Sequence, residues 1–98
     1  MNLQGTFAVV TGGAQGLGYA VCKAYAREGM RLAIMDVRGD KLDELTAELR
    51  ADGVAVLPLQ VDLSDADATQ QAIDAALTWG GTPRILVHNA ALLIQRSM

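Results

Sequence analysis

A glycine-rich run at residues 11–18, TGGAQGLG, constrains the fold of this chain more than any other feature. It follows a short apolar run at residues 7–10 and precedes an alanine-rich segment with helical periodicity. The order strand, glycine-rich turn and helix is typical of an element that binds phosphate groups. The first glycine permits a turn that a Cβ would disfavour, and the later ones let the backbone approach a ligand closely. The helix that follows directs free N–H groups and the positive end of its dipole at a pyrophosphate.

An acidic residue, Asp36, ends a second apolar run and lies 18 positions after Gly18. This is close to the offset of about 20 residues expected for a carboxylate that binds the adenosine ribose. Such a carboxylate accepts hydrogen bonds from both ribose hydroxyls and repels a 2′-phosphate, so we expect NAD as the cofactor rather than NADP. Arg38 could instead receive a 2′-phosphate, which keeps NADP open as the alternative. Gln15, inside the glycine run, adds no second basic group.

The glycine run resembles the T-G-x-x-x-G-x-G motif of the short-chain dehydrogenase/reductase family, and further matches follow in the same order. Asp62 and Leu63 end a third apolar run, where the family places an aspartate that contacts the adenine amino group. Residues 84–87 resemble the buried fourth strand, and residues 88–91, HNAA, follow it where the family usually carries N-N-A-G. The resemblance covers nearly the whole chain.

This resemblance implies a dinucleotide site at the carboxyl ends of four strands. Its expected members are Thr11, Gly12, Gln15, Gly16, Leu17, Gly18, Asp36, Val37, Asp62, Leu63, Asn89, Ala90 and Ala91. We expect a bulky residue at Gly18 to close the approach to the pyrophosphate and leave the chain foldable. His88 replaces the first asparagine of the family motif and is expected to be structural. Ala91 replaces the glycine, and its methyl group is expected to lower cofactor affinity somewhat.

No catalytic residue is predicted within these 98 residues. The resemblance implies that catalysis needs a serine, a tyrosine and a lysine from elements after the fourth strand. Tyr19 and Lys23 have the Y-x-x-x-K spacing, but they lie in the first turns of the phosphate-binding helix. With i,i+4 spacing they share one face of that helix, which we expect to turn away from the sheet. Ser97 is too close to the fourth strand to be the serine of the family, and no metal site is predicted.

The alternation of strands and helices predicts an α/β fold, a Rossmann-like doubly wound parallel sheet with strand order 3-2-1-4. Pro58 lacks an N–H group, which favours an outer position for the third strand. We expect residues 1–98 to be the N-terminal portion of a single dinucleotide-binding domain, truncated after the fourth strand. The apolar residues 85–87 would otherwise form an exposed edge, which suggests a longer polypeptide.

Helical spacing also predicts which residues face the core and where one helix begins. In the first helix the predicted apolar stripe is Leu17, Val21, Ala24 and Tyr25, and in the second it is Leu42, Leu45 and Leu49. Ser64 is expected to begin the third helix, with Asp67 completing a capping box.

Composition excludes several classes of function. The net charge of −3, with eight scattered basic residues, gives no footprint for nucleic acid. The single cysteine, Cys22, cannot form an internal disulfide and is expected to be a small buried side chain, which fits a reducing compartment. No apolar run approaches the ~18 residues of a membrane span. We therefore expect a cytoplasmic protein without nucleic-acid or membrane partners.

Two hypotheses about function remain. In the first, the chain is the NAD-binding half of an oxidoreductase that transfers hydride between a nicotinamide cofactor and a small alcohol or carbonyl substrate. The catalytic groups would then lie beyond Met98, this chain alone would be inactive, and the full-length protein would form a homo-oligomer. In the second, the chain is complete and is a non-catalytic nucleotide-binding or interaction module. A P-loop phosphotransferase is disfavoured because no Gly-Lys-Ser/Thr follows the glycines.

Overall fold

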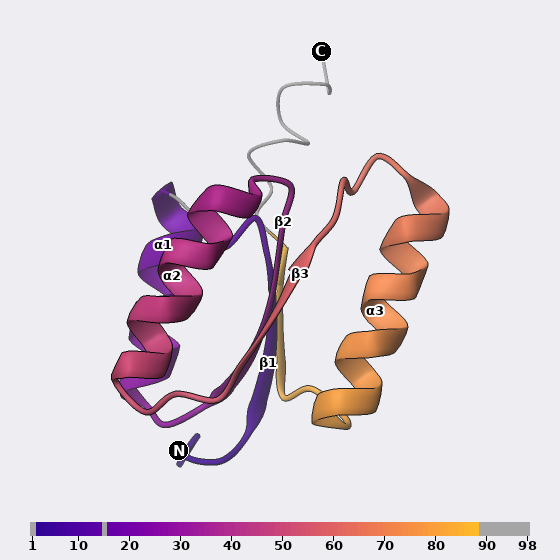
Figure 1. Ribbon diagram of the computed structural model, residues 1–98. Helices are drawn as coiled ribbons and strands as arrows, with labels where there is room; N and C mark the ends of the chain where they lie inside the picture. The colour runs from indigo at the N-terminus through magenta and orange to yellow at the C-terminus, as the bar shows by residue number, and fades with distance from the viewer. Residues whose placement is uncertain (1, 15, 89–98) are drawn as a thin grey trace.

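The computed structural model describes residues 2–14 and 16–88 of the chain. Within them a parallel sheet separates two layers of helix, with α1 and α2 on one face and α3 on the other (Figure 1). The elements are β1 (Phe7–Thr11), α1 (Gly16–Arg27), β2 (Arg31–Asp36), α2 (Gly39–Ala51), β3 (Val56–Gln60), α3 (Ala66–Gly80) and β4 (Ile85–His88).

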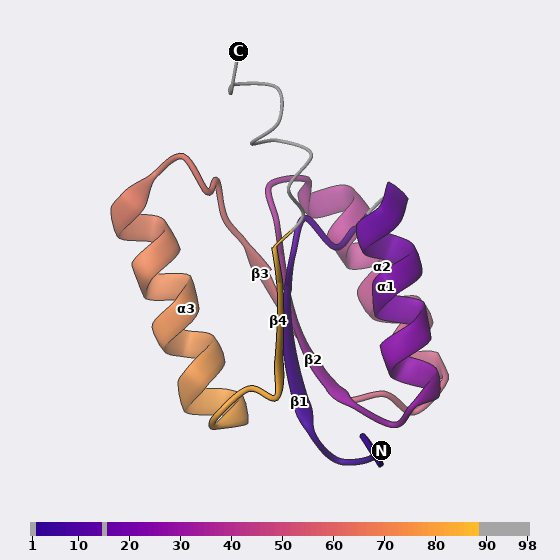
Figure 2. The ribbon, with the colours of Figure 1, turned by 180° about the vertical axis from the view of Figure 1, so that it is seen from behind.

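The strands lie in the order β3-β2-β1-β4, and every neighbouring pair is parallel. Figure 2 shows the sheet from behind, where β4 lies along β1. The order confirms the predicted doubly wound topology. It also confirms that β3, which carries Pro58, is an outer strand, where a missing N–H group is tolerated.

Two apolar clusters fill the space between the sheet and its helices. Alternate residues of β1 and β2 enter one cluster or the other, because successive side chains of a strand point to opposite faces. Leu42, Leu45 and Leu49 of α2 are buried on the α1/α2 side, as predicted, and Ala72 and Ala76 of α3 are buried on the other side. The continuous apolar runs of β1 and β2 are therefore explained by burial on both faces.

The outer strand β4 is covered on one face only. Ile85 and Val87 are half-buried and pack against the α1/α2 cluster, whereas Leu86 is 68% exposed on the other face. The predicted exposed apolar edge is thus concentrated at Leu86 in the described part of the chain.

The face that α1 turns to the core differs from the prediction. Gly18 and Cys22 are buried and Tyr25 and Ala26 pack against the cluster, while Leu17 is 72% exposed. The predicted stripe is confirmed at Tyr25 and is otherwise wrong by about one position, because Gly18 lies directly against the backbone of the glycine-rich loop. This contact sets the rotation of the helix, so Cys22, one turn further, reaches the core.

The start of α3 also differs from the prediction. Asp65 is the N-cap, and its carboxylate accepts a hydrogen bond from the Ala68 N–H at 3.0 Å. Ser64 does not cap the helix, because its hydroxyl donates instead to Asp62 Oδ1 at 2.7 Å. At the other end of α3, Trp79 packs edge-to-face on Phe7, with 5.7 Å between ring centroids.

Candidate cofactor site

Polar side chains from neighbouring strands meet at the carboxyl edge of the sheet. Thr11 ends β1 and is aligned with Met35 of β2 on one side and with His88 of β4 on the other. Asp36 follows Met35, and it is aligned with Gln60 of β3. The strand order reverses between β1 and β4, and ligands of doubly wound sheets bind in the crevice at such a point.

The glycine-rich loop joins this edge to the N-terminus of α1. The Gly12 N–H donates to the carbonyl oxygen of Met35 at 2.7 Å, and Gly12 has a φ of 65°. Gly16 begins α1 with a φ of 60°, and a Cβ there would meet no atom within 4 Å. Open space beside the first turn of a helix, whose N–H groups lack intrahelical partners, fits a phosphate group. The exposed Leu17 lies in the same turn.

Gly18 is required by the packing of the loop itself. A Cβ at Gly18 would lie 2.0 Å from the Gly12 carbonyl oxygen and 2.9 Å from the Gly13 Cα. Both are backbone atoms, so no side chain can move aside. A bulky residue here would therefore collide with the loop itself, so we expect it to lower stability as well as to close the approach to the pyrophosphate. Gly13, which was not among the predicted site residues, is also closely packed, but against side chains: a Cβ there would lie 2.6 Å from Ile34 Cγ2.

Asp36 is buried beneath the glycine-rich loop, with only 6% of its surface exposed. Its Oδ2 accepts a hydrogen bond from the Ala14 N–H and its Oδ1 accepts one from the Arg38 N–H, both at 2.9 Å. Hydrogen bonds to a charged acceptor compensate for the burial of the carboxylate. Through its hydrogen bond with Ala14, Asp36 therefore holds the glycine-rich loop against the end of β2. Each oxygen keeps a further lone pair for a ligand donor.

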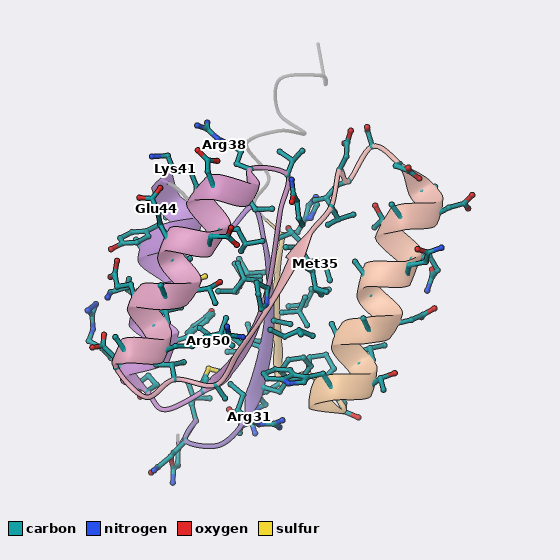
Figure 3. All side chains as sticks on the ribbon, in the orientation of Figure 1. Arg31, Met35, Arg38, Lys41, Glu44 and Arg50 are labelled. Carbon is teal, nitrogen blue, oxygen red and sulfur yellow. The ribbon has the colours of Figure 1, made fainter. Side chains whose placement is uncertain are left out.

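Two side chains next to Asp36 are turned outward. Val37 is 57% exposed and offers an apolar surface at the same edge. Arg38 and Lys41 lie at the same end of α2 (Figure 3), and Lys41 has Glu44 3.9 Å away as a weak ionic partner. Positive charge is thus present beside the buried carboxylate.

Asp62 lies in the exposed loop between β3 and α3. Its Oδ1 accepts hydrogen bonds from the Ser64 N–H at 2.9 Å and the Ser64 hydroxyl at 2.7 Å, and these lower the pKa of the Asp62 carboxyl. Leu63 is half-buried and packs against the α3-side cluster. The Val61 N–H donates to the Asp36 carbonyl at 3.0 Å, which brings this loop to the end of β2.

At the other side of the loop, Thr11 contacts His88. The Thr11 Oγ1 lies 2.9 Å from the His88 Nδ1 and 3.4 Å from the Val87 carbonyl oxygen. Gln15, Asn89, Ala90 and Ala91 of the predicted site lie outside the described residues.

Tyr19 and Lys23 face α2, where both contact Glu48. The Tyr19 hydroxyl lies 2.9 Å from Glu48 Oε2, and the Lys23 ammonium forms an ion pair with the same oxygen. The hydrogen bond with Glu48 raises the pKa of Tyr19, the opposite of what a proton-transferring tyrosine needs. The pair joins α1 to α2 on the outer side of the fold.

Residues 2–14 and 16–88 hold no group of three or more histidine, cysteine, aspartate or glutamate side chains placed to bind a metal ion. None of the described helices has the length and hydropathy needed to cross a membrane.

The fold and the glycine-rich loop define a dinucleotide-binding α/β protein of the doubly wound class. A family model, short chain dehydrogenase, matches residues 6–98, and the chain belongs to the short-chain dehydrogenase/reductase family. This confirms the resemblance drawn from the four motifs. The family is one of oxidoreductases whose members bind nicotinamide dinucleotides.

Within the aligned segments, named relatives are 36–40% identical to the chain. It is 40% identical over 91 residues to a short chain dehydrogenase of Pseudocercospora fijiensis, which covers 93% of the chain and 29% of the relative. It is 38% identical over 91 residues to the D-threitol dehydrogenase of Mycolicibacterium smegmatis, and this match covers 93% of the chain and 35% of the relative. The chain thus spans about a third of the length of these two relatives.

Solved structures show the same arrangement. A short-chain dehydrogenase/reductase from Burkholderia phymatum in complex with NAD matches with a TM-score of 0.83 and 34% identity, over 88% of the chain and 31% of that structure. The L-sorbose reductase of Gluconobacter frateurii, complexed with NADPH and L-sorbose, matches with a TM-score of 0.84 and 30% identity. This match covers 93% of the chain and 36% of that structure. These proteins bind either NAD or NADPH, so the likeness extends to a nicotinamide cofactor without selecting one.

Proposed function

We propose that this chain is the NAD-binding half of an oxidoreductase that transfers hydride between a nicotinamide cofactor and an alcohol or carbonyl substrate. The observation that carries the proposal is the buried Asp36 carboxylate, held under the glycine-rich loop at the end of β2. Its position allows it to accept hydrogen bonds from ribose hydroxyls, and its fixed negative charge repels a 2′-phosphate. The relatives named for alcohols, such as D-threitol dehydrogenase, support an alcohol or carbonyl as the substrate class.

In this proposal each part of the carboxyl edge holds one part of the dinucleotide. The pyrophosphate lies at the start of α1, the adenosine ribose at Asp36, and the adenine between Val37 and Asp62. The full set of cofactor-binding residues is Thr11, Gly12, Gln15, Gly16, Leu17, Gly18, Asp36, Val37, Asp62, Leu63, Asn89, Ala90 and Ala91. Gly18 acts by shaping the loop, because its own surroundings are backbone atoms.

The preference for NAD rests on the balance between Asp36 and the cations beside it. The side chains of Arg38 and Lys41 would favour NADP. The backbone N–H of Arg38, however, donates to Asp36 and holds the carboxylate at the same edge. A 2′-phosphate bound by Arg38 would therefore lie within reach of a fixed negative charge. We infer that this repulsion outweighs the attraction, because the carboxylate is buried and less screened than the exposed cations.

We further propose that residues 1–98 form the N-terminal portion of one dinucleotide-binding domain, and that the catalytic groups and the substrate pocket come from later elements. The protein would act in the cytoplasm and as a homo-oligomer.

The test is a titration of the protein, as its gene encodes it, with NADH and with NADPH, followed by fluorescence. We expect tighter binding of NADH, and Asp36→Ala should weaken NADH binding and reduce the preference over NADPH. Asp43→Ala is the matched control, because Asp43 is an exposed aspartate on α2 and the substitution removes the same charge. Equal affinities for the two cofactors in the unmodified protein, or an Asp36→Ala variant that behaves like Asp43→Ala, would contradict the NAD preference.

A further inference from the structure

Gln60 ends the outer strand β3 and lies next to the start of α2. It is aligned with Asp36 of β2, and both residues lie on the α1/α2 face of the sheet, as Val56 and Ile34 of the same strands do. From there its side chain reaches the connection between β2 and α2. The Gln60 Nε2 donates a hydrogen bond to the Val37 carbonyl oxygen at 3.3 Å. An outer strand thus contributes a side chain to the segment that follows Asp36.

The packing of Gly39 gives independent evidence for this contact. Gly39 is the first residue of α2, and a Cβ there would lie 2.7 Å from Gln60 Oε1 and 2.9 Å from Gln60 Nε2. The amide group of Gln60 therefore occupies the space that a side chain at position 39 would need. Because this amide is the end of a flexible side chain, a Cβ would push it aside and leave the backbone in place. Glycine at this position thus permits the contact.

One peptide group links Gln60 to the Asp36 carboxylate. The Val37 carbonyl and the Arg38 N–H belong to the same planar unit. Its oxygen accepts the hydrogen bond from Gln60, and its N–H donates to Asp36 Oδ1 at 2.9 Å. Because the unit is rigid, fixing its oxygen also fixes the direction of its N–H. Hydrogen bonds in such a chain also polarise one another. Gln60 therefore acts on the carboxylate through this peptide.

We propose that Gln60 is a positioning residue for the adenosine ribose of the cofactor. By holding the Val37–Arg38 peptide, it keeps the Asp36 carboxylate turned so that the remaining lone pairs meet the two ribose hydroxyls. The inference rests on the function proposed above and concerns binding and cofactor selectivity alone. A loosened carboxylate would accept hydrogen bonds from NADH less well, whereas NADPH, which carries a phosphate at the 2′ position, would lose little.

Removal of the Gln60 amide tests the proposal in the protein as its gene encodes it. Gln60→Ala should raise the Kd of NADH about threefold, because one long hydrogen bond is lost, and leave the Kd of NADPH almost unchanged. The preference for NADH should therefore narrow about threefold. Gln70→Ala is the matched control, because Gln70 is a glutamine on α3 whose amide donates to Asp74. Equal rises for both cofactors, or an unchanged Kd for NADH, would overturn the proposal.

Gly39→Ala tests the same contact while Gln60 is still present. Alanine fits the helical backbone of α2 and has the higher helix propensity, so this variant should be at least as stable as the unmodified protein. It should nevertheless narrow the preference for NADH as much as Gln60→Ala does, and the double variant should show no further loss. Additive losses, or a Gly39→Ala variant that keeps the full preference, would contradict the proposal.

A double-mutant cycle with Asp36 tests the path from Gln60 to the ligand. In the Asp36→Ala background, Gln60→Ala should have no further effect on the Kd of NADH, because Gln60 acts through the Asp36 carboxylate. The same threefold loss in both backgrounds would mean that Gln60 acts by another route, and a positioning role through Asp36 would then be wrong.

Two NMR signals test the peptide in the absence of any cofactor. In Gln60→Ala the Val37 carbonyl 13C signal and the Arg38 amide 1H signal should both move upfield, because hydrogen bonds at both ends of the peptide weaken. A shift of the carbonyl signal alone, or of neither signal, would overturn the proposal.

The same measurements separate this inference from the proposed function. If the unmodified protein binds neither NADH nor NADPH, the proposed function fails, and the two NMR signals still decide whether Gln60 positions the peptide. If the protein binds NADH and Asp36→Ala weakens that binding while Gln60→Ala does not, the inference about Gln60 alone fails.

Discussion

Two aspartates at the carboxyl edge of the sheet are held in different ways. Asp36, the last residue of β2, is buried beneath the glycine-rich loop and accepts hydrogen bonds from backbone N–H groups of two separate segments. The loop after β3 is exposed, and its Asp62 is held by Ser64, two residues away. The first aspartate is therefore part of the tertiary structure, whereas the second belongs to a local turn.

Because of this difference, substitutions in the two regions should affect stability and cofactor binding in different proportions. Changes in the glycine-rich loop alter the packing of β1, β2 and α1 together, because Gly13, Gly18 and Asp36 all contact other segments. Changes in the loop after β3 alter an exposed turn. We therefore expect substitutions of Gly13, Gly18 or Asp36 to affect both folding and cofactor binding. Substitutions at Asp62 should affect binding and have only a small effect on stability.

The largest effect is expected for Gly18→Ala. The new Cβ would lie 2.0 Å from the Gly12 carbonyl oxygen, so α1 or the loop must shift. We expect a loss of about 3 kcal/mol in the free energy of unfolding, at the upper end for overpacked sites. Denaturant unfolding measures it. Gly53→Ala is the control: it has free space but a φ of 82°, and its loss should be about 1 kcal/mol. Equal losses at the two glycines would contradict the conclusion that close packing against the loop makes Gly18 necessary.

A smaller loss is expected for Asp36→Asn. The substitution removes the charge and leaves one buried backbone N–H facing an amide group, which costs about 1–3 kcal/mol in the free energy of unfolding. Asp62→Asn is the matched substitution in the exposed loop and should leave the unfolding transition almost unchanged. Thermal unfolding of the two variants side by side compares the loops directly. A variant at Asp62 as unstable as the one at Asp36 would contradict the comparison.

A pH-dependent effect is expected from Cys22, which lies under the glycine-rich loop. Burial raises the pKa of its thiol to about 12. The unfolded thiol titrates near 8.5. Because the folded pKa is the higher one, this contribution to stability is complete below about pH 8.5 and is lost as the pH rises toward 12. Unfolding measured from pH 8 to pH 10.5 should show a decline that Cys22→Ala reduces. The same slope in both proteins would exclude Cys22 as its cause.

The smallest effect is expected from Ser64→Ala. Hydrogen bonds from Ser64 lower the pKa of Asp62, so loss of the hydroxyl should raise that pKa toward the ordinary value for aspartate. The folded pKa is the lower one, so the contribution to stability is present above about pH 4 and is lost at more acidic pH. A carboxyl 13C titration measures the pKa. Because the Ser64 N–H still donates to the carboxylate, the shift should be partial. No shift at all would show that the hydroxyl contributes nothing.

The sequence was sufficient to predict the strand order, the outer position of β3 and the placement of Asp36 at the carboxyl edge. The strands, the turns and the outer position of β3 follow from apolar runs, glycines and proline, which are local signals. The strand order follows from the doubly wound fold that the alternation and the resemblance imply. The rotation of α1 about its axis was not predictable, because in its alanine-rich sequence more than one face of the helix is apolar enough to pack on the sheet. The contact of Gly18 with Gly12 decides it, and that contact exists only in the folded chain. The burial of Asp36 was missed for the same reason, since its partner Ala14 has no side-chain signal.

The pairing of β1 with β4 has a consequence for the order in which the chain folds. Thr11 and His88 are 77 residues apart in sequence yet lie side by side. During synthesis β1 can pair with β2 early, but its other edge stays open until residues 85–88 leave the ribosome. Closing so long a loop is slow relative to local contacts, and an unpaired apolar strand edge is prone to aggregation meanwhile. The strand that lies beside β1 at the crevice is thus also the one whose arrival covers the open edge of β1.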